Sequence, residues 1–164
     1  VCIPVAVRHF RVIIKPSPDP LDLSGIVWPE PLRLIVVNEA EHDVGRAINP
    51  MLLEGQIYGA VIMGTGYALT ERLILEKGEV MNANFRDYKI LTAKDVIPIE
   101  PVIVETVDED GPYGAKGIGE PGCVPTAPAI ANAIYDAIGV RLRDLPITPE
   151  KIVKALREKE GGSD

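Results

Sequence analysis

The fold is decided by residues 43–71, which read DVGRAINPMLLEGQIYGAVIMGTGYALTE. Asn49 and Pro50 mark a helix start, because an asparagine side chain can cap free N–H groups and proline is tolerated at the first helical position. We expect this helix to run from Pro50 to about Arg72. It contains glycines at 55, 59, 64 and 66, and each glycine costs about 1 kcal/mol relative to alanine. Something must therefore approach this helix very closely.

The composition sets limits on the class of protein. A chain of 164 residues with 46% hydrophobic and 25% charged residues is long enough for one domain with a core. A net charge of −7 and scattered basic residues exclude a general nucleic-acid-binding role. The longest uncharged run, residues 55–70, is glycine-rich and shorter than the roughly 20 apolar residues of a membrane-spanning helix. Two cysteines are too few for a disulfide framework, a four-cysteine zinc site or an iron–sulfur cluster, and they fit a reducing compartment, the cytoplasm.

The rest of the chain predicts an α+β domain. Strands are expected at 3–14, 32–37 and 96–107, with Pro98 and Pro101 placing the last at an edge or delaying its start. A short hairpin is expected around Lys77-Gly78. Residues 16–31 read as a proline-rich loop or arm, and 161–164 as a frayed tail. The remaining helices are expected at 126–138, ending at Gly139, and at 149–158.

A second glycine cluster lies near the C-terminal end, in GPYGAKGIGEPGCVP (111–125). Glu120 ends this loop and precedes Pro121, so its carboxylate and neighbouring N–H groups can come close to a ligand; a solvated or helix-capping glutamate is the alternative. Gln56 could bind a polar ligand among the helix glycines, or simply be satisfied by neighbouring backbone. Lys116 could contact an anion or lie at the surface. Cys123 could be reactive near a helix start or simply be a small buried residue.

A metal site is not predicted from the sequence. Glu41, His42 and Asp43 are consecutive, and neighbouring residues of a strand point to opposite faces, so structural or surface roles are expected for them. The glycines of GAKGIGE (114–120) have the wrong spacing for a dinucleotide-binding fingerprint.

Two stretches together resemble one family. DVGRAINPMLLEGQIYGA (43–60), continued by MGTGYALTE (63–71), resembles the molybdenum-binding subunit of the xanthine dehydrogenase/aldehyde oxidase family. GAKGIGEP (114–121), followed by APAIANAI (127–134), resembles the active-site loop and following helix of that subunit. The similarity covers about residues 32–158 in the same order. It implies a molybdopterin-binding domain at 32–160, with the mixed sheet and helices of the C-terminal part of that subunit, preceded by a divergent strand and proline-rich arm at 1–31.

The resemblance also implies roles for individual residues. Glu120 matches the glutamate that acts as general base on the molybdenum-bound hydroxyl, during hydroxylation of an aldehyde or N-heterocycle carbon with water as oxygen source. Gln56 matches the glutamine that hydrogen-bonds the pyranopterin. The remaining expected cofactor-binding residues are Gly55, Lys116, Gly117, Ile118 and Gly119.

Other parts of the enzyme are expected on other chains. The family's subunit is several times longer, so the resemblance implies that the rest of it is a partner and that the isolated chain is inactive. The cofactor is molybdenum-pyranopterin in its plain or cytosine dinucleotide form, and iron–sulfur clusters and FAD are expected only on partner chains. The substrate is a small molecule, and no nucleic-acid or membrane partner is expected. Two alternatives remain open: a non-catalytic interaction or scaffold module that retains the fold, and a general small-ligand-binding domain.

Overall fold

The computed structural model describes residues 5–16 and 32–161, with side chains from Ala40 to Lys159. Of the divergent strand and proline-rich arm expected at residues 1–31, only residues 5–16 are described, and the rest of the arm lies outside the described residues. Residues 162–164 of the expected tail are outside them as well. In the described part of the chain, no helix has the length and apolar character needed to cross a membrane.

A three-stranded mixed sheet forms one layer of the fold, which agrees with the predicted α+β class. Its strand order is β1 (Val5–Pro16), β2 (Leu32–Asp43), β5 (Ile99–Val104). β1 and β2 run antiparallel, with a register irregularity between Ala6 and His9, whereas β5 runs parallel to β2. β5 is an edge strand of this sheet that starts after Pro98, as its prolines predict, because proline has no N–H to donate to a strand ladder. The β2 strand extends six residues beyond the predicted 32–37, since its last part pairs with β5.

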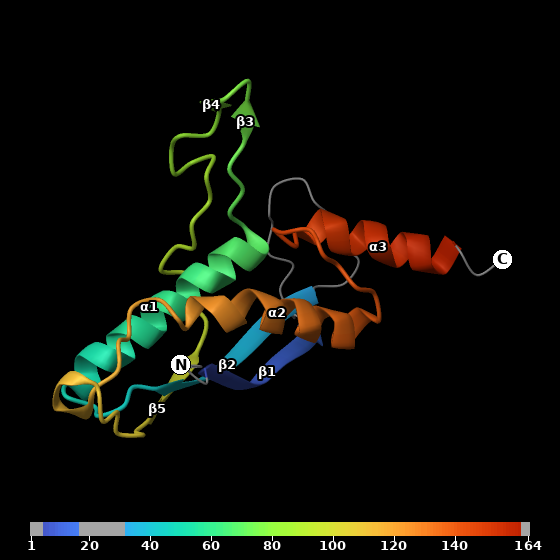
Figure 1. Cartoon of the computed structure of the whole chain (residues 1–164). Coiled ribbons are helices and arrows are strands. Elements are labelled where there is room, and N and C mark those ends of the chain that lie inside the picture. The colour runs from blue at the N-terminus through green and yellow to red at the C-terminus, as the bar shows by residue number, and fades with distance from the viewer. Residues whose placement is uncertain (1–4, 17–31, 162–164) are drawn as a thin grey trace.

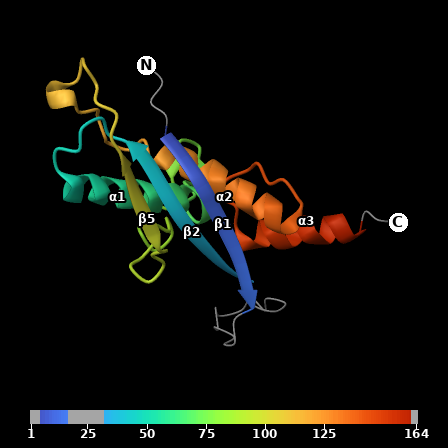
Figure 2. The same ribbon diagram turned by 90° about the horizontal axis from the view of Figure 1, so that it is seen from below.

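Two long helices cover the same face of this sheet (Figures 1 and 2). α1 (Pro50–Leu69) contacts β5, and α2 (Cys123–Ile138) contacts β1. One small core cluster lies between α1 and the sheet and contains Ala40, Ile57 and Val61. The helices therefore bury the sheet on one side and pack along each other.

The predicted start of α1 is confirmed, and its predicted end is wrong by three residues. The Asn49 side chain accepts a hydrogen bond from the Leu52 N–H at 3.2 Å, which caps the helix. The helix ends at Leu69 because Thr70 leaves helical geometry (φ −131°, ψ −32°). The N–H groups of Thr70 and Glu71 then both donate to the carbonyl of Gly66.

The α2 helix begins three residues before the predicted 126 and ends as predicted. Gly139 adopts the left-handed conformation (φ 67°) that terminates helices, and its N–H donates to Tyr135 O. Ala68, Ile130, Ile134 and Ile147 form a second core cluster, so α2 packs against the C-terminal end of α1. α3 (Pro149–Gly161) follows and runs three residues beyond the predicted 158, so Gly161 of the expected tail is helical.

Between α1 and β5, the chain leaves the body as a hairpin (Figure 1). The predicted short hairpin is confirmed as β3 (Leu75–Glu76) and β4 (Glu79–Val80). Asn82 lies at its base and is 4% exposed. Its side chain accepts from Ile74 N–H at 2.9 Å and donates to Arg72 O at 2.6 Å.

Candidate functional site

A backbone strap joins the second glycine cluster to the chain just beyond β2. The Lys116 N–H donates to Val44 O at 2.9 Å, and the Arg46 N–H donates to Gly114 O at 2.8 Å. Between them Gly45 has φ +67°, and a Cβ there would lie 2.5 Å from Gly114 O and 2.8 Å from Lys116 N. A side chain at position 45 would therefore push the two segments apart. We call these paired segments, residues 44–46 and 114–116, the strap.

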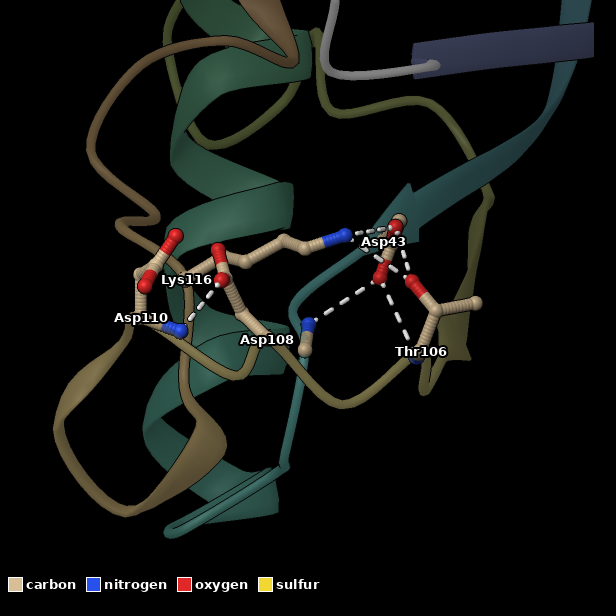
Figure 3. A network of polar contacts seen from close by, with 6 residues as sticks. Asp43, Thr106, Asp108, Asp110 and Lys116 are labelled. Carbon is tan, nitrogen blue, oxygen red and sulfur yellow. Dashed lines mark hydrogen bonds and ion pairs between the residues drawn. The ribbon is translucent and has the colours of Figure 1, made fainter. Parts of the chain in front are cut away.

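Beside the strap, Asp43 at the end of β2 is buried and is the centre of a polar network (Figure 3). Lys116 Nζ lies 2.5 Å from Asp43 Oδ2, and the side chains of the pair are 18% and 5% exposed. The Thr106 hydroxyl donates to the same oxygen at 2.5 Å and accepts from Lys116 Nζ at 2.9 Å. The other oxygen, Oδ1, accepts from the N–H groups of Gly45 at 3.0 Å and Thr106 at 3.3 Å. Four donors from three segments thus converge on one carboxylate.

This network keeps the Asp43 carboxyl ionised. Burial raises its pKa, but the hydrogen bonds from Lys116, Thr106 and Gly45, together with the Lys116 charge, outweigh burial and hold the pKa well below its usual range. Both the ammonium and the backbone N–H of Lys116 therefore have partners inside the chain. The contact between Lys116 and the cofactor that the resemblance implies stays a prediction beside these contacts inside the chain.

His42 precedes this network and differs from it. Its side chain is 2% exposed, and Nε2 has no hydrogen-bond partner in the described part of the chain. Burial lowers the pKa of His42, against the opposing effect of the Asp43 charge, so the neutral form is favoured. Among the described residues, no three His, Cys, Asp or Glu side chains are grouped to hold a metal ion.

Beyond the strap, the chain crosses over α1. Ile118 packs against the cluster of Ala40, Ile57 and Val61, so its side chain belongs partly to the core, and its contact with a cofactor stays a prediction. A Cβ added at Gly122 would lie 3.2 Å from the Cβ of Ala60. Ile57 and Ala60 lie within one helical turn after Gln56, so residues 118 and 122 of the second glycine cluster pack against the same part of α1.

The glycines of these clusters have two different surroundings. A Cβ at Gly64 would lie 2.6 Å from Thr126 Cβ on α2, which confirms that a neighbour approaches α1 closely there. At Gly55 and Gly59, in contrast, a Cβ would meet no atom of the described chain within 4 Å. The same is true of Gly117 and Gly119 in the loop. Close packing inside this chain therefore explains only part of the glycine clustering.

These open glycines border exposed polar groups. Gln56 is exposed and lies on the same side of α1 as Gly59, three residues on. In the loop, the N–H groups of residues 117–120 donate no hydrogen bond within the described chain. We call these two exposed sets of residues, Gly55, Gln56 and Gly59 on α1 and residues 117–120 in the loop, the open glycine surface.

Glu120 is exposed at the end of this surface. Its carbonyl accepts from the Cys123 N–H at 3.0 Å, which ties it to the first turn of α2. Burial raises the pKa of the Cys123 thiol, and the Glu120 and Glu71 charges raise it further. The thiol therefore stays protonated, which disfavours a reactive role for Cys123.

Sequence reasoning missed the network at the strap. It assigned Asp43 only a structural or surface role and did not consider Thr106 or its pairing with Lys116. The available sequence signal was weak, because Asp43 lies six residues beyond the predicted strand and is marked only by the Val-Gly that follows it. An open depression nearby is lined by Arg46, Glu105, Asp108 and Glu109, among others, and includes neither Gln56 nor Glu120.

Comparison with known proteins gives consistent matches. A family model described as a molybdopterin cofactor-binding domain matches residues 36–97. A xanthine dehydrogenase molybdenum-binding subunit of Escherichia coli O157:H7 is 42% identical over 113 residues, which are 68% of this chain and 15% of that protein. The gamma subunit of a 6-hydroxypseudooxynicotine dehydrogenase complex of Paenarthrobacter nicotinovorans is 41% identical over 114 residues, 67% of this chain and 14% of that protein. The chain thus spans about a seventh of the length of these relatives.

Solved structures agree with this result. Quinoline 2-oxidoreductase from Pseudomonas putida 86 superposes with a TM-score of 0.70 at 32% identity, covering 77% of this chain and 17% of that one. Aldehyde oxidoreductase from Desulfovibrio gigas gives a TM-score of 0.68 at 33% identity, covering 76% of this chain and 14% of that one.

Proposed function

The chain belongs to the molybdenum-binding subunits of the xanthine dehydrogenase/aldehyde oxidase family, and from this premise we propose that its open glycine surface binds the molybdenum-pyranopterin cofactor of a larger hydroxylase. Within that enzyme, Glu120 acts as general base. The reaction is hydroxylation of an aldehyde or N-heterocycle carbon with water as the oxygen source.

The open glycine surface is the observation that carries the proposal. Gly55 and Gly59 each cost helix stability, yet no atom of the described chain lies where their side chains would be. Gly117 and Gly119 leave the loop of residues 117–120 equally bare. Such a surface lets a flat, polar group contact the backbone directly. The free N–H groups of residues 117–120 and the Gln56 amide provide hydrogen-bonding groups suited to a pterin ring system rich in nitrogen and oxygen.

Glu120 is the carboxylate suited to proton transfer at this surface. It is exposed, its backbone is tied to α2 through Cys123, and two of the three residues before it are glycines. When bound, the cofactor supplies the oxygen-transfer and electron-accepting chemistry. Glu120 accepts the proton that this chemistry releases.

The proposal is tested by Glu120→Gln in the assembled enzyme. Glutamine keeps the shape of the side chain but cannot accept the proton, so we expect turnover to fall by about 10²- to 10⁴-fold, the usual contribution of a general base. Molybdenum content, measured by elemental analysis, should not change. Glu109→Gln, an exposed glutamate of the preceding loop, is the matched control. Wild-type turnover in the Glu120 variant would refute the general-base role.

We propose that the remaining parts of the enzyme come from partners. These are the rest of the molybdenum-binding subunit and subunits carrying iron–sulfur clusters and FAD. The two cysteines of the sequence are too few to hold a cluster, so we place the iron–sulfur clusters outside these 164 residues. We place the complex in the cytoplasm, in keeping with sparse cysteines and a reducing compartment. Purification of the native complex, with metal analysis and identification of the co-purifying chains, tests this composition.

A further inference from the structure

We propose that Lys116 is a positioning residue for Glu120: by binding buried Asp43, it fixes the start of the loop that presents the Glu120 carboxylate at the open glycine surface. This inference rests on the proposed function, because it takes Glu120 as the general base. It gives Lys116 a role inside the chain in place of direct contact with the cofactor.

The first argument is where the loop is held. On one side, residues 114–116 are fixed by the strap, and on the other the Glu120 carbonyl accepts from the first turn of α2. Between these points, residues 117–119 make no hydrogen bond within the described chain. Two of the three are glycines, which have the widest backbone freedom. The direction in which this short segment leaves Lys116 therefore affects where Glu120 lies.

The second argument is the strength of the anchor. The Asp43 carboxylate is almost fully buried and accepts four hydrogen bonds, from Lys116, Gly45 and twice from Thr106. A buried ion pair stabilises one geometry when its remaining lone pairs are satisfied in this way. Because Asp43 ends β2 and Thr106 follows β5, the ammonium joins the loop to two neighbouring strands of the sheet (Figure 3).

The third argument is that the pair is present throughout the neutral pH range. Although burial raises the pKa of Asp43, its hydrogen bonds and the Lys116 charge hold the pKa below the usual range. The carboxylate is therefore charged whenever the enzyme would work. The anchor acts as a permanent clamp on the loop, with no switching role.

The test compares variants of the assembled enzyme. In Lys116→Met, which keeps the chain length but loses the charge, we expect kcat to fall by about 10- to 100-fold, because displacement of a catalytic group by about 1 Å costs up to that much. KM and molybdenum content should stay within about twofold. Lys116→Arg, which retains the charge, should recover most of the loss. Lys154→Met removes a lysine from an exposed helix pair and should leave kcat unchanged.

A double variant separates positioning from stability. Lys116→Met alone leaves a buried charge without its partner, whereas Asp43→Asn combined with Lys116→Met removes both charges. We expect the double variant to regain most of the lost thermal stability but to keep the low kcat. Recovery of kcat together with stability would overturn the proposal, as would wild-type kcat in Lys116→Met.

A second readout requires neither cofactor nor turnover. In the 164-residue chain, hydrogen exchange at the strap amides of Arg46 and Lys116 should become about tenfold faster in Lys116→Met and in the double variant. Unchanged exchange would overturn the anchoring role. If Glu120→Gln retained turnover, the proposed function would fail while this exchange experiment still tested the anchor. If Glu120→Gln were inactive and Lys116→Met normal, only the positioning role would fail.

Discussion

Replacement of Gly64 by alanine tests whether close helix packing requires the glycines of α1. A Cβ at this position would lie 2.6 Å from Thr126 Cβ and 3.0 Å from Cys123 O. The first distance is about 1 Å shorter than the optimal carbon–carbon separation, so α1 and α2 must move apart. Overpacking of this kind costs up to about 3 kcal/mol. Alanine returns about 1 kcal/mol through its higher helix propensity.

The expected net effect is therefore a loss of about 2 kcal/mol in the free energy of unfolding. For a chain of this size that corresponds to a fall in Tm of roughly 4–8 °C, or to a shift of about 1 M in the urea midpoint. Urea unfolding of the 164-residue chain, followed by helical circular dichroism, measures it.

Gly55→Ala and Gly59→Ala are matched controls in the same helix. Both positions are open in the described chain, so alanine should stabilise it by about 0.5–1 kcal/mol at each position. In the assembled enzyme, the same two substitutions should lower molybdenum content, because the added methyl groups lie on the open glycine surface. The reasoning is refuted if Gly64→Ala is as stable as wild type, or if all three variants shift stability in the same direction.

Two further predictions concern other parts of the fold. The folded-state pKa of Asp43 is depressed below its reference value of 3.8, so its contribution to stability is present above that pH and is lost as the pH falls below it. Thermal unfolding between pH 7 and pH 2 should therefore show a steeper fall of Tm with acid in wild type than in Asp43→Asn. Parallel curves for the two proteins would contradict this. Asn82→Ala leaves Ile74 N–H and Arg72 O without their side-chain partner. The free energy of unfolding should fall by about 1–3 kcal/mol, and hydrogen exchange at the Ile74 amide should become faster. An unchanged exchange rate at Ile74 would show that Asn82 does not hold the base of the hairpin.

Several elements could be predicted because their signals are local. Asn49-Pro50 starts α1, and Gly139 ends α2 in a left-handed conformation. Pro98 and Pro101 place β5 at a sheet edge, because a residue without an N–H cannot complete a central ladder. Such capping and ladder effects depend on only a few neighbouring residues.

Element lengths were less predictable because they depend on distant partners. β2 continues to Asp43 because Ile99–Val104 pairs beside its second half. The end of α1 at Leu69 is set locally instead, because the N–H groups of Thr70 and Glu71 both donate to Gly66 O, and the sequence pattern did not resolve this turn. The pairing of β2 with β5 joins residues far apart in the chain, and no local pattern predicts it.

The sequence by itself determined the family, the α+β class and the two glycine clusters, because these depend on residue identity and order. Only the tertiary structure decided what each glycine does. Gly64 meets α2, whereas Gly55 and Gly117 face open space. It also decided the role of Lys116, whose partner Asp43 lies 73 residues away. An ammonium in a glycine loop looks available to any anion, and it is the folding of β2 beside β5 that brings a buried carboxylate within its reach.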